Sequence, residues 1–102
     1  MDFKEIPLAK VDDIPEGKGI VVLLPEGKEV ALFKVKGQIY ALNNECPHKG
    51  APLGEGELEG CMVSCPWHGW LFDVRNGACE NMPGEDAESI AISVKNGDVF
   101  LA

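Results

Sequence analysis

The chain consists of short runs in which apolar and polar residues alternate, and Gly, Pro and Asn separate these runs. None of the runs continues with the periodicity of a helix. The dipeptides Asn76-Gly77 and Asn96-Gly97 are typical of two-residue hairpin turns, in which both residues need positive φ. A further turn is expected at Lys36-Gly37. The pattern therefore predicts an all-β fold.

Strands are expected wherever an alternating run lies between turn residues. They cover residues 4–8, 19–24, 29–35, 38–43, 62–65, 71–74, 89–95 and 98–101. In the run 89–95, Ile90, Ile92 and Val94 alternate with smaller or polar residues, which predicts one buried and one solvated face. A short helical turn is expected at residues 8–13.

The composition changes near residue 43. Aliphatic strands give way there to a segment rich in Gly, Pro and Cys, which runs to about residue 88. A length of 102 residues suits one domain with a modest core. We therefore expect a single domain over residues 1–102, in which 43–88 form a subdomain inserted into a β base domain.

Two arms of this segment each pair a Cys with a His: Cys46-Pro47-His48 and Cys65-Pro66-Trp67-His68. Thiolates bind iron strongly, and imidazoles bind it as neutral ligands. A pair of irons bridged by sulfides takes this ligand set when both Cys bind one iron and both His bind the other. The arms therefore predict that Cys46, His48, Cys65 and His68 hold one 2Fe–2S cluster, which indicates electron transfer.

The residues around the arms suit a buried cofactor. Large apolar side chains are expected to exclude water from the inner iron, namely Leu53, Trp67, Trp70 and Phe72. Packing is the simpler role for both indoles, and assistance in electron transfer is the alternative. The remaining Cys61 and Cys79 are expected to be buried free thiols outside the site, with a disulfide between them as the alternative.

Two other kinds of site compete with the cluster. A structural zinc site also uses two Cys and two His, but zinc fingers usually place both Cys in one arm and both His in the other. A nucleophilic Cys with a His base would need only one such pair. A colourless protein with stoichiometric zinc would exclude the iron–sulfur interpretation.

The acidic residues are concentrated around the arms. Residues 43–88 carry nine acidic and two basic side chains, out of 17 and 9 in the whole chain. This charge disfavours nucleic acid and anionic membranes as partners. The acidic segment would attract a basic patch on a redox partner. A role of the acidic residues in solubility explains the charge equally well.

The chain shows no sequence signal for a membrane or for export. Its longest apolar run, residues 20–24, is far too short to span a membrane, and no signal-peptide pattern opens the chain. We therefore expect a soluble cytoplasmic protein. In that setting, and because two of the four Cys lie beside His, metal ligation is favoured over a disulfide framework.

The stretch 46–72 resembles the Rieske signature, in which C-x-H is followed by C-x-x-H. His68-Gly69-Trp70 is similar to the second loop of bacterial Rieske ferredoxins and ring-hydroxylating oxygenases. The resemblance implies the Rieske fold, with three stacked antiparallel sheets and a cluster-binding subdomain. It also implies Cys46 and Cys65 on the buried iron and His48 and His68 on the exposed one. Residues 81–85 resemble the proline-containing third loop of this family, although a plain surface turn explains them nearly as well.

The chain departs from the high-potential branch of the family, which serves respiratory and photosynthetic cytochrome complexes. Members of that branch carry a disulfide between the cluster loops, at positions matched here by Ala51 and Trp67. They also carry hydroxyl donors at the positions of Trp70 and Phe72. Fewer donors stabilise the reduced cluster less. We therefore expect a reduction potential toward the low end of the Rieske range.

The resemblance implies a monomeric one-electron carrier that is not itself an enzyme. It would accept electrons from an NAD(P)H-dependent flavin reductase and pass them to the terminal oxygenase of a ring-hydroxylating dioxygenase system. The edge formed by His48, Lys49 and His68 would be the docking surface. The alternative is the small subunit of an assimilatory NAD(P)H nitrite reductase, partnered by the large subunit, because residues 46–53 resemble those subunits equally well.

Overall fold

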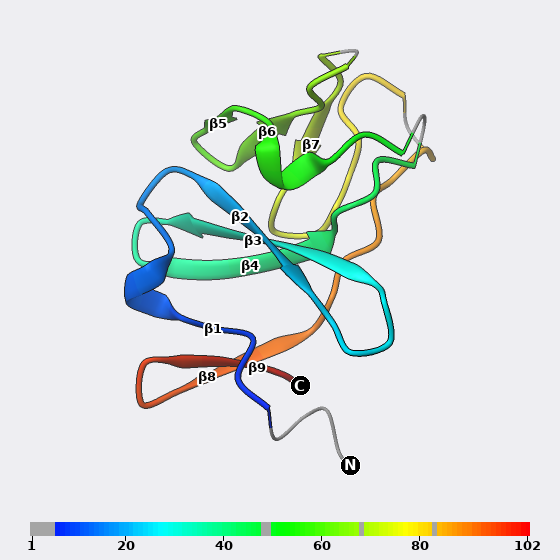
Figure 1. The fold of residues 1–102 in the computed structure, drawn as a ribbon. Helices are drawn as coiled ribbons and strands as arrows, with labels where there is room; N and C mark the ends of the chain where they lie inside the picture. The colour runs from blue at the N-terminus through cyan, green and yellow to red at the C-terminus, as the bar shows by residue number, and fades with distance from the viewer. Residues whose placement is uncertain (1–5, 48–49, 68, 83) are drawn as a thin grey trace.

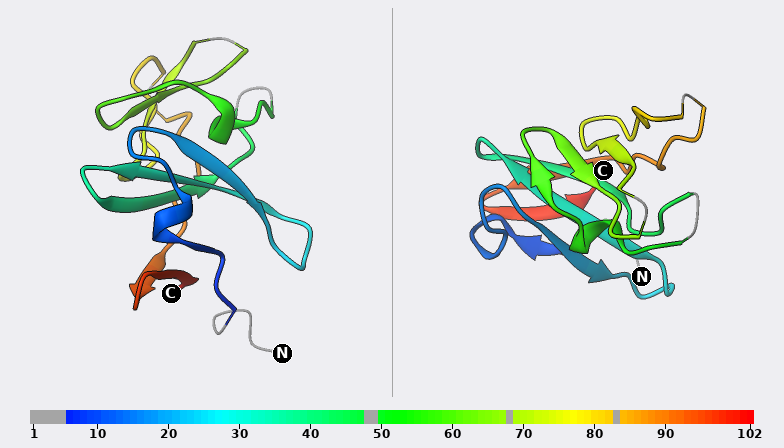
Figure 2. Two further views of the ribbon diagram at one scale, coloured as in Figure 1. Left: turned by 60° about the vertical axis from the view of Figure 1, so that its left-hand side comes forward. Right: turned by 90° about the horizontal axis from the view of Figure 1, so that it is seen from above.

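The computed structural model describes residues 6–47, 50–67, 69–82 and 84–102. Its strands form three antiparallel sheets of three strands each, stacked one above another (Figure 1; Figure 2). Helical structure in these residues is limited to two 3-10 turns, η2 (Val11–Asp13) and η3 (Leu53–Glu55). No helix among them is both long and apolar enough to cross a membrane. The predicted all-β class is confirmed.

The central sheet has the order β2-β3-β4. Its strands are β2 (Gly19–Leu23), β3 (Glu29–Val35) and β4 (Gln38–Asn43). The predicted bounds of β3 and β4 are confirmed, and β2 ends one residue earlier than predicted. Lys36 and Gly37 join β3 to β4 with φ of 51° and 78°, as a two-residue hairpin turn requires.

A second sheet, of order β1-β9-β8, contains the first and last strands of the described chain. It consists of β1 (Ala9–Lys10), β8 (Ile92–Lys95) and β9 (Asp98–Leu101). Asn96 and Gly97 both have positive φ, which confirms the predicted turn. The predicted strand 4–8 is misplaced, because residues 6–8 are outside any strand and residues 4 and 5 lie outside the described chain.

The alternating face predicted for residues 90–94 is only partly correct. Ile90 and Ile92 pack against the core, but Val94 is 49% exposed. β8 is the edge strand of this sheet, with β9 on one side and no further strand of the sheet on the other.

The third sheet, of order β5-β6-β7, lies within residues 43–88. It contains β5 (Leu58–Glu59), β6 (Met62–Ser64) and β7 (Leu71–Asp73). The sequence does predict β6 and β7, each one residue longer than observed. It does not predict β5, because two residues are too few to show an alternating pattern.

The turn predicted at Asn76-Gly77 has a different geometry. Gly77 has a φ of 83°, but Asn76 does not have positive φ, which a type I′ turn needs. The carbonyl of Asp73 instead accepts hydrogen bonds from the N–H groups of Asn76 at 3.3 Å and Gly77 at 2.6 Å. The glycine is needed for close packing, because a Cβ on it would collide with the carbonyl of Ala87.

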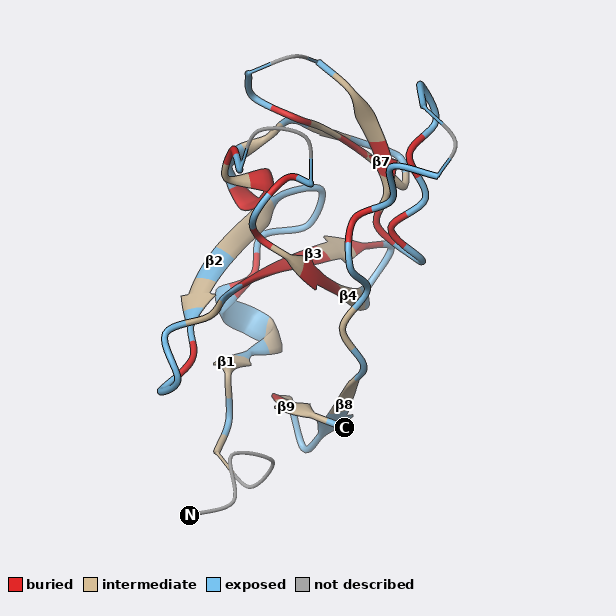
Figure 3. Cartoon of the chain, turned by 90° about the vertical axis from the view of Figure 1, so that its right-hand side faces the viewer, coloured by how far each residue is buried: buried red, intermediate tan, exposed pale blue. Residues whose placement is uncertain are grey.

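Strand β3 supplies side chains to both apolar cores of the described chain. Most of this strand has the colour of buried residues in Figure 3. Ala31 and Phe33 belong to one core, which continues into the third sheet. Val30 and Leu32 belong to the other core, which lies toward β8 and β9. Successive side chains of a strand point to opposite faces, so a strand buried on both sides can join two cores.

Candidate metal centre

The first Cys loop is closed by two main-chain hydrogen bonds. The N–H of Cys46 donates to the carbonyl of Ala51 at 2.9 Å, and the carbonyl of Cys46 accepts from the N–H of Gly50 at 2.7 Å. Gly50 has a φ of 74°, a conformation that is costly for residues with a Cβ. These bonds hold Gly50 and Ala51, at the end of the loop, against Cys46 at its start.

The second Cys loop repeats this geometry. The N–H of Cys65 donates to the carbonyl of Trp70 at 2.8 Å, and its carbonyl accepts from the N–H of Gly69 at 2.9 Å. Gly69 has a φ of 72°. Each Cys therefore begins the same backbone frame, with a left-handed Gly four residues later. The two loops thus share these two hydrogen bonds and the left-handed Gly, in addition to the Cys-Pro dipeptide that begins each.

The frames place both Cys in one apolar core. Cys46 is 2% exposed and Cys65 is 1% exposed. Leu53 and Phe72 belong to the same core and are fully buried. A thiolate in such a place needs a compensating positive charge, which a metal ion provides. Two thiols in matching loops of one dry core thus fit the cysteine half of an iron–sulfur site.

The other half of the predicted ligand set lies outside the described residues. His48 and His68 are both in this group, as is Lys49 of the predicted docking edge. Within residues 6–47, 50–67, 69–82 and 84–102, no three His, Cys, Asp or Glu side chains are grouped to hold a metal ion. The structure thus places two of the four predicted ligands and leaves the histidines as predictions.

The prediction for the apolar residues around the site is correct except at Trp67. Leu53 and Phe72 are buried, and Trp70 packs partly against the same core. Trp67 is 61% exposed and cannot exclude water. It lies between Cys65 and Gly69, the ends of the second loop that main-chain hydrogen bonds hold together, and takes part in neither of these bonds.

The two other cysteines are in the same region but outside the Cys loops. Cys79 is buried and Cys61 is partly buried against the core. None of the four cysteines, all of which the structure describes, forms a disulfide. This confirms the predicted free thiols, although Cys61 is less buried than expected.

The segment predicted as a third loop is held against the start of β7. The Oδ1 of Asn81 accepts from the N–H of Leu71 at 2.7 Å, and the N–H of Glu80 donates to the carbonyl of Leu71 at 2.9 Å. Leu71 directly follows Trp70, the last residue of the second Cys loop. Pro83, in the middle of this segment, lies outside the described residues.

Asn44 is a residue near the site that the sequence analysis misses. Among the described residues it is the one buried polar side chain, with 2% exposure. Its Oδ1 accepts from the N–H of Gly54 at 2.7 Å, and its Nδ2 donates to the Oε1 of Glu29 at 3.4 Å. An Asn beside a Gly- and Pro-rich loop normally indicates a turn, so its sequence context gives no sign of this burial.

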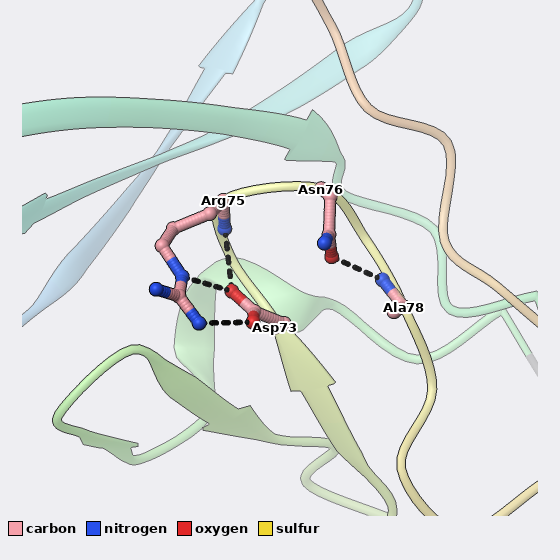
Figure 4. A network of polar contacts seen from close by, with 4 residues as sticks. All are labelled: Asp73, Arg75, Asn76 and Ala78. Atoms are coloured by element: carbon pink, nitrogen blue, oxygen red, sulfur yellow. Dashed lines mark hydrogen bonds and ion pairs between the residues drawn. The ribbon is translucent and has the colours of Figure 1, made fainter.

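Charged side chains hold the segments around the site in place. The carboxylate of Glu88 accepts from Lys28 Nζ at 2.8 Å and from Asn43 Nδ2 at 3.1 Å. These bonds, led by that of Lys28, hold the pKa of Glu88 below its usual value. Asp73, the last residue of β7, forms a second ion pair with Arg75 (Figure 4). The Lys28–Glu88 pair connects segments on either side of the Cys loops in the sequence, and the Asp73–Arg75 pair is local to the turn after β7.

Comparison with known families identifies the site. A family model described as the Rieske [2Fe-2S] domain matches residues 4–96. The chain belongs to the Rieske family. The cofactor of this Rieske protein is a Rieske-type 2Fe–2S cluster, and the predicted three-sheet Rieske fold is confirmed.

The relatives of this Rieske protein include electron-transfer proteins of similar length. The ferredoxin component of a naphthalene 1,2-dioxygenase system from Pseudomonas putida is 44% identical, over 99% of this chain and 97% of its own. A structure described as a complex of reduced oxygenase and oxidized ferredoxin in carbazole 1,9a-dioxygenase matches with a TM-score of 0.88 and 28% identity, covering 99% of this chain and 94% of the other.

A third similarity points to a different class of protein. A structure from Mycobacterium tuberculosis, assigned as the small subunit of an NADH-dependent nitrite reductase, matches with a TM-score of 0.85. Its identity is 26%, and the match covers 94% of this chain and 91% of that one. Both classes that the sequence suggests are thus represented among proteins of this fold.

Proposed function

We propose that this Rieske protein is the ferredoxin component of a ring-hydroxylating dioxygenase system. It would take one electron at a time from an NAD(P)H-dependent flavin reductase and deliver it to a terminal oxygenase. The observation that carries the proposal is the match over nearly the whole of both chains to a dioxygenase ferredoxin component, at 44% identity. The chain itself would carry out no substrate chemistry.

Four residues would hold the cofactor in this proposal. Cys46 and Cys65 bind one iron, and His48 and His68 bind the other. The burial of both Cys in one core supports the first pair. When bound, the cluster supplies a one-electron redox centre, and its imidazole ligands raise its potential above that of all-cysteine clusters.

The surrounding chain has two tasks in this proposal. Leu53 and Phe72 keep water from the two thiolates, because both side chains are fully buried in the core that contains Cys46 and Cys65. The acidic residues of the segment 43–88 attract a basic surface on a partner, so that encounters are fast and transient. Residues 43–88 would act as the cluster-binding subdomain within a single domain.

We also place the protein in the cytoplasm as a monomer. The proposed electron source, NAD(P)H, is an intracellular reductant, which supports this location. A mobile carrier has to expose its docking edge to two partners in turn, and a monomer does so most simply. Light scattering that gives a mass of 11.0 kDa would support the monomer.

Substitution of single cysteines tests the ligand assignment. We expect Cys46→Ser and Cys65→Ser to lose the iron and the visible spectrum of the purified protein. Cys79→Ser is the matched control, because Cys79 is also a buried thiol of the same core but lies outside the Cys loops. Full iron content in Cys46→Ser, or stoichiometric zinc in the wild type, would contradict the assignment.

Reconstitution tests the electron-carrier function. Purified flavin reductase, NADH, this chain and a terminal ring-hydroxylating oxygenase are combined, and the hydroxylated product is measured. We expect product to form in proportion to the amount of this chain and to be absent with Cys65→Ser. A wild-type protein that holds the cluster but accepts no electron from any candidate reductase would overturn the proposal.

The second candidate function is that of a nitrite reductase small subunit, which the similarity to the Mycobacterium tuberculosis structure favours. In that case the chain would remain bound to a large subunit and would not move between partners. Co-purification with a sirohaem-containing subunit, together with nitrite reduction that depends on this chain, would support this alternative over the dioxygenase ferredoxin.

A further inference from the structure

We infer that Asn44 and the 3-10 turn η3 form a positioning unit that sets the separation between Cys46 and Cys65. Asn44 lies two residues before Cys46, and Ser64, on the other side of η3, lies directly before Cys65. The inference rests on the proposed function, in which these two thiolates bind the same iron.

Asn44 caps the start of η3 with two oxygen atoms. Its main-chain carbonyl accepts from the N–H of Leu53 at 2.7 Å, and its Oδ1 accepts from the N–H of Gly54 at 2.7 Å. The first N–H groups of a helical turn have no partner within the turn itself. Asn44 therefore satisfies both at once, from a position with almost no access to water.

The same residue is anchored to the central sheet. The N–H of Asn44 donates to the carbonyl of Glu29 at 3.1 Å, and its Nδ2 donates to the Oε1 of Glu29 at 3.4 Å. Glu29 is the first residue of β3. Asn44 thus uses its main chain and its side chain to fix η3 to the strand that joins the two cores.

The main-chain pairing at the base of each Cys loop, called its stem below, explains why such a cap is needed. The second loop continues into the paired strands β6 and β7, in which Ser64 lies opposite Leu71. The described residues of the first loop instead form one isolated bridge, between Glu45 and Pro52, before the chain turns into η3. The Oδ1 of Asn44 takes up the N–H of Gly54 at the point where this short stem ends.

The residue that follows η3, Gly56, packs against Ser64, the last residue of β6, directly before the second Cys loop. A Cβ on Gly56 would collide with the carbonyl of Ser64, so the main chains approach one another closely here. The N–H of Ser64 donates to the carbonyl of Glu57 at 2.8 Å, which fixes the alignment of the two segments. Any displacement of η3 is therefore transmitted to the residue next to Cys65.

The near side of η3 is packed just as tightly. A Cβ on Gly54 would lie 2.6 Å from Val21 Cγ2 and 3.0 Å from the Oδ1 of Asn44. Leu53, directly before Gly54 in η3, is fully buried. The turn thus has little freedom to shift, and a change on either side alters the positions of the two Cys loops relative to each other.

The test compares Asn44→Ala and Gly56→Ala with wild-type protein that holds its iron. The readouts are iron per protein, the EPR g-values of the reduced protein, the visible circular dichroism, and the half-time of iron loss to a chelator. We expect altered g-values and dichroism in both variants, and iron loss at least about threefold faster. These properties report the geometry at the iron and not only the stability of the fold.

Two controls separate positioning from general destabilisation. Gly60→Ala strains a left-handed glycine, with a φ of 61°, that has no atom within 4 Å of its Cβ position. Asn76→Ala removes a similar bond, from the N–H of Ala78 to the Oδ1 of Asn76 at 2.9 Å, in an exposed turn (Figure 4). We expect both controls to keep wild-type g-values and dichroism, even where their melting temperatures fall.

A double variant tests whether the bonds themselves are responsible. In Asn44→Asp with Glu29→Gln, a carboxylate still accepts from Gly54, and the new amide at position 29 donates to that carboxylate. We expect this pair to regain the wild-type g-values, while Asn44→Asp alone does not, because two carboxylates then face each other.

Each outcome decides the inference. The inference is overturned if Asn44→Ala and Gly56→Ala both keep the spectra and the rate of iron loss of the wild type. It is also overturned if Gly60→Ala changes the spectra as much as these two variants do. If Gly56→Ala does not fold, the Asn44 variants alone decide. A wild-type protein without iron would instead refute the proposed function on which the inference rests.

Discussion

Asp73 accepts three hydrogen bonds from Arg75, at 3.0 Å from Nε, 2.7 Å from Nη2 and 2.9 Å from the main-chain N–H (Figure 4). This pair closes the turn that follows β7, where the carbonyl of Asp73 also accepts from Gly77. The side-chain bonds from Arg75 are the main reason that the pKa of Asp73 lies below its ordinary value of 3.8.

The Asp73–Arg75 pair should stabilise the fold in a pH-dependent way. A lowered folded-state pKa means that the stabilisation is present above the ordinary value of 3.8 and is lost as the pH falls through the folded-state pKa. We expect Asp73→Asn to lower the free energy of unfolding by about 0.5 to 1 kcal/mol at neutral pH. In urea unfolding, the difference in free energy of unfolding between Asp73→Asn and the wild type should become smaller as the pH is lowered from 7 to 3. Glu59→Gln, which changes the same charge on the exposed side of β5, is the control.

Glu16 should titrate below its ordinary pKa of 4.5. Its carboxylate accepts from the N–H of Gly37 at 2.9 Å and from that of Lys36 at 2.7 Å, and these two bonds are the main cause of the lowered pKa. We expect the amide resonances of both turn residues to shift with a midpoint below pH 4.5. Glu16→Gln should abolish that titration. A midpoint at or above 4.5 would contradict the role of these bonds.

Leu53 and Leu32 allow a matched comparison of the two cores. Both side chains are fully buried, Leu53 in the core that contains Cys46 and Leu32 in the other core. We expect Leu53→Ala and Leu32→Ala each to lower the free energy of unfolding by about 2 to 5 kcal/mol. Only Leu53→Ala should also hasten the loss of iron to a chelator. If Leu53→Ala and Leu32→Ala have the same free energy of unfolding and also lose iron at the same rate, the two cores do not act separately on the site.

The reduction potential should be low for a Rieske protein. Phe72 is fully buried and, like Trp70, offers no hydroxyl donor. We expect a wild-type midpoint nearer to about −150 mV than to about +300 mV, the limits of the Rieske range. Phe72→Tyr should raise the midpoint, because a hydroxyl donor stabilises the more negative reduced state. Phe72→Leu, which adds no donor, is the control. A wild-type midpoint well above zero in a redox titration would contradict this prediction.

Much of the fold can be read from local patterns in the sequence. β3 and β4 are long enough to show alternation, and the dipeptides Lys36-Gly37 and Asn96-Gly97 adopt the turns that their composition predicts. At Asn76-Gly77 the same reasoning is wrong, because close packing on Ala87 decides the backbone there. Local preference predicts a turn only where no tertiary contact overrides it.

The site is predictable to a smaller extent. The Cys–His spacing identifies the arms, and the structure shows that Cys46 and Cys65 share one core. The exposure of Trp67 and the burial of Asn44 follow from which side of a loop packs on the core, and a single sequence contains no local signal for this. Asn44 in particular bonds to Glu29 and Gly54, which are distant from it in sequence.

The pairing of β1 with β9 has a consequence for how this fold can be joined to others. Ala9 lies opposite Val99, so the first and last strands of the described chain are neighbours in the sheet at the opposite end of the molecule from the Cys loops (Figure 1; Figure 2). A module fused beyond either strand would therefore be tethered at the end of the molecule that lies away from the Cys loops. Such a fold can be built into a longer polypeptide, or circularly permuted, and still present its redox centre to a partner.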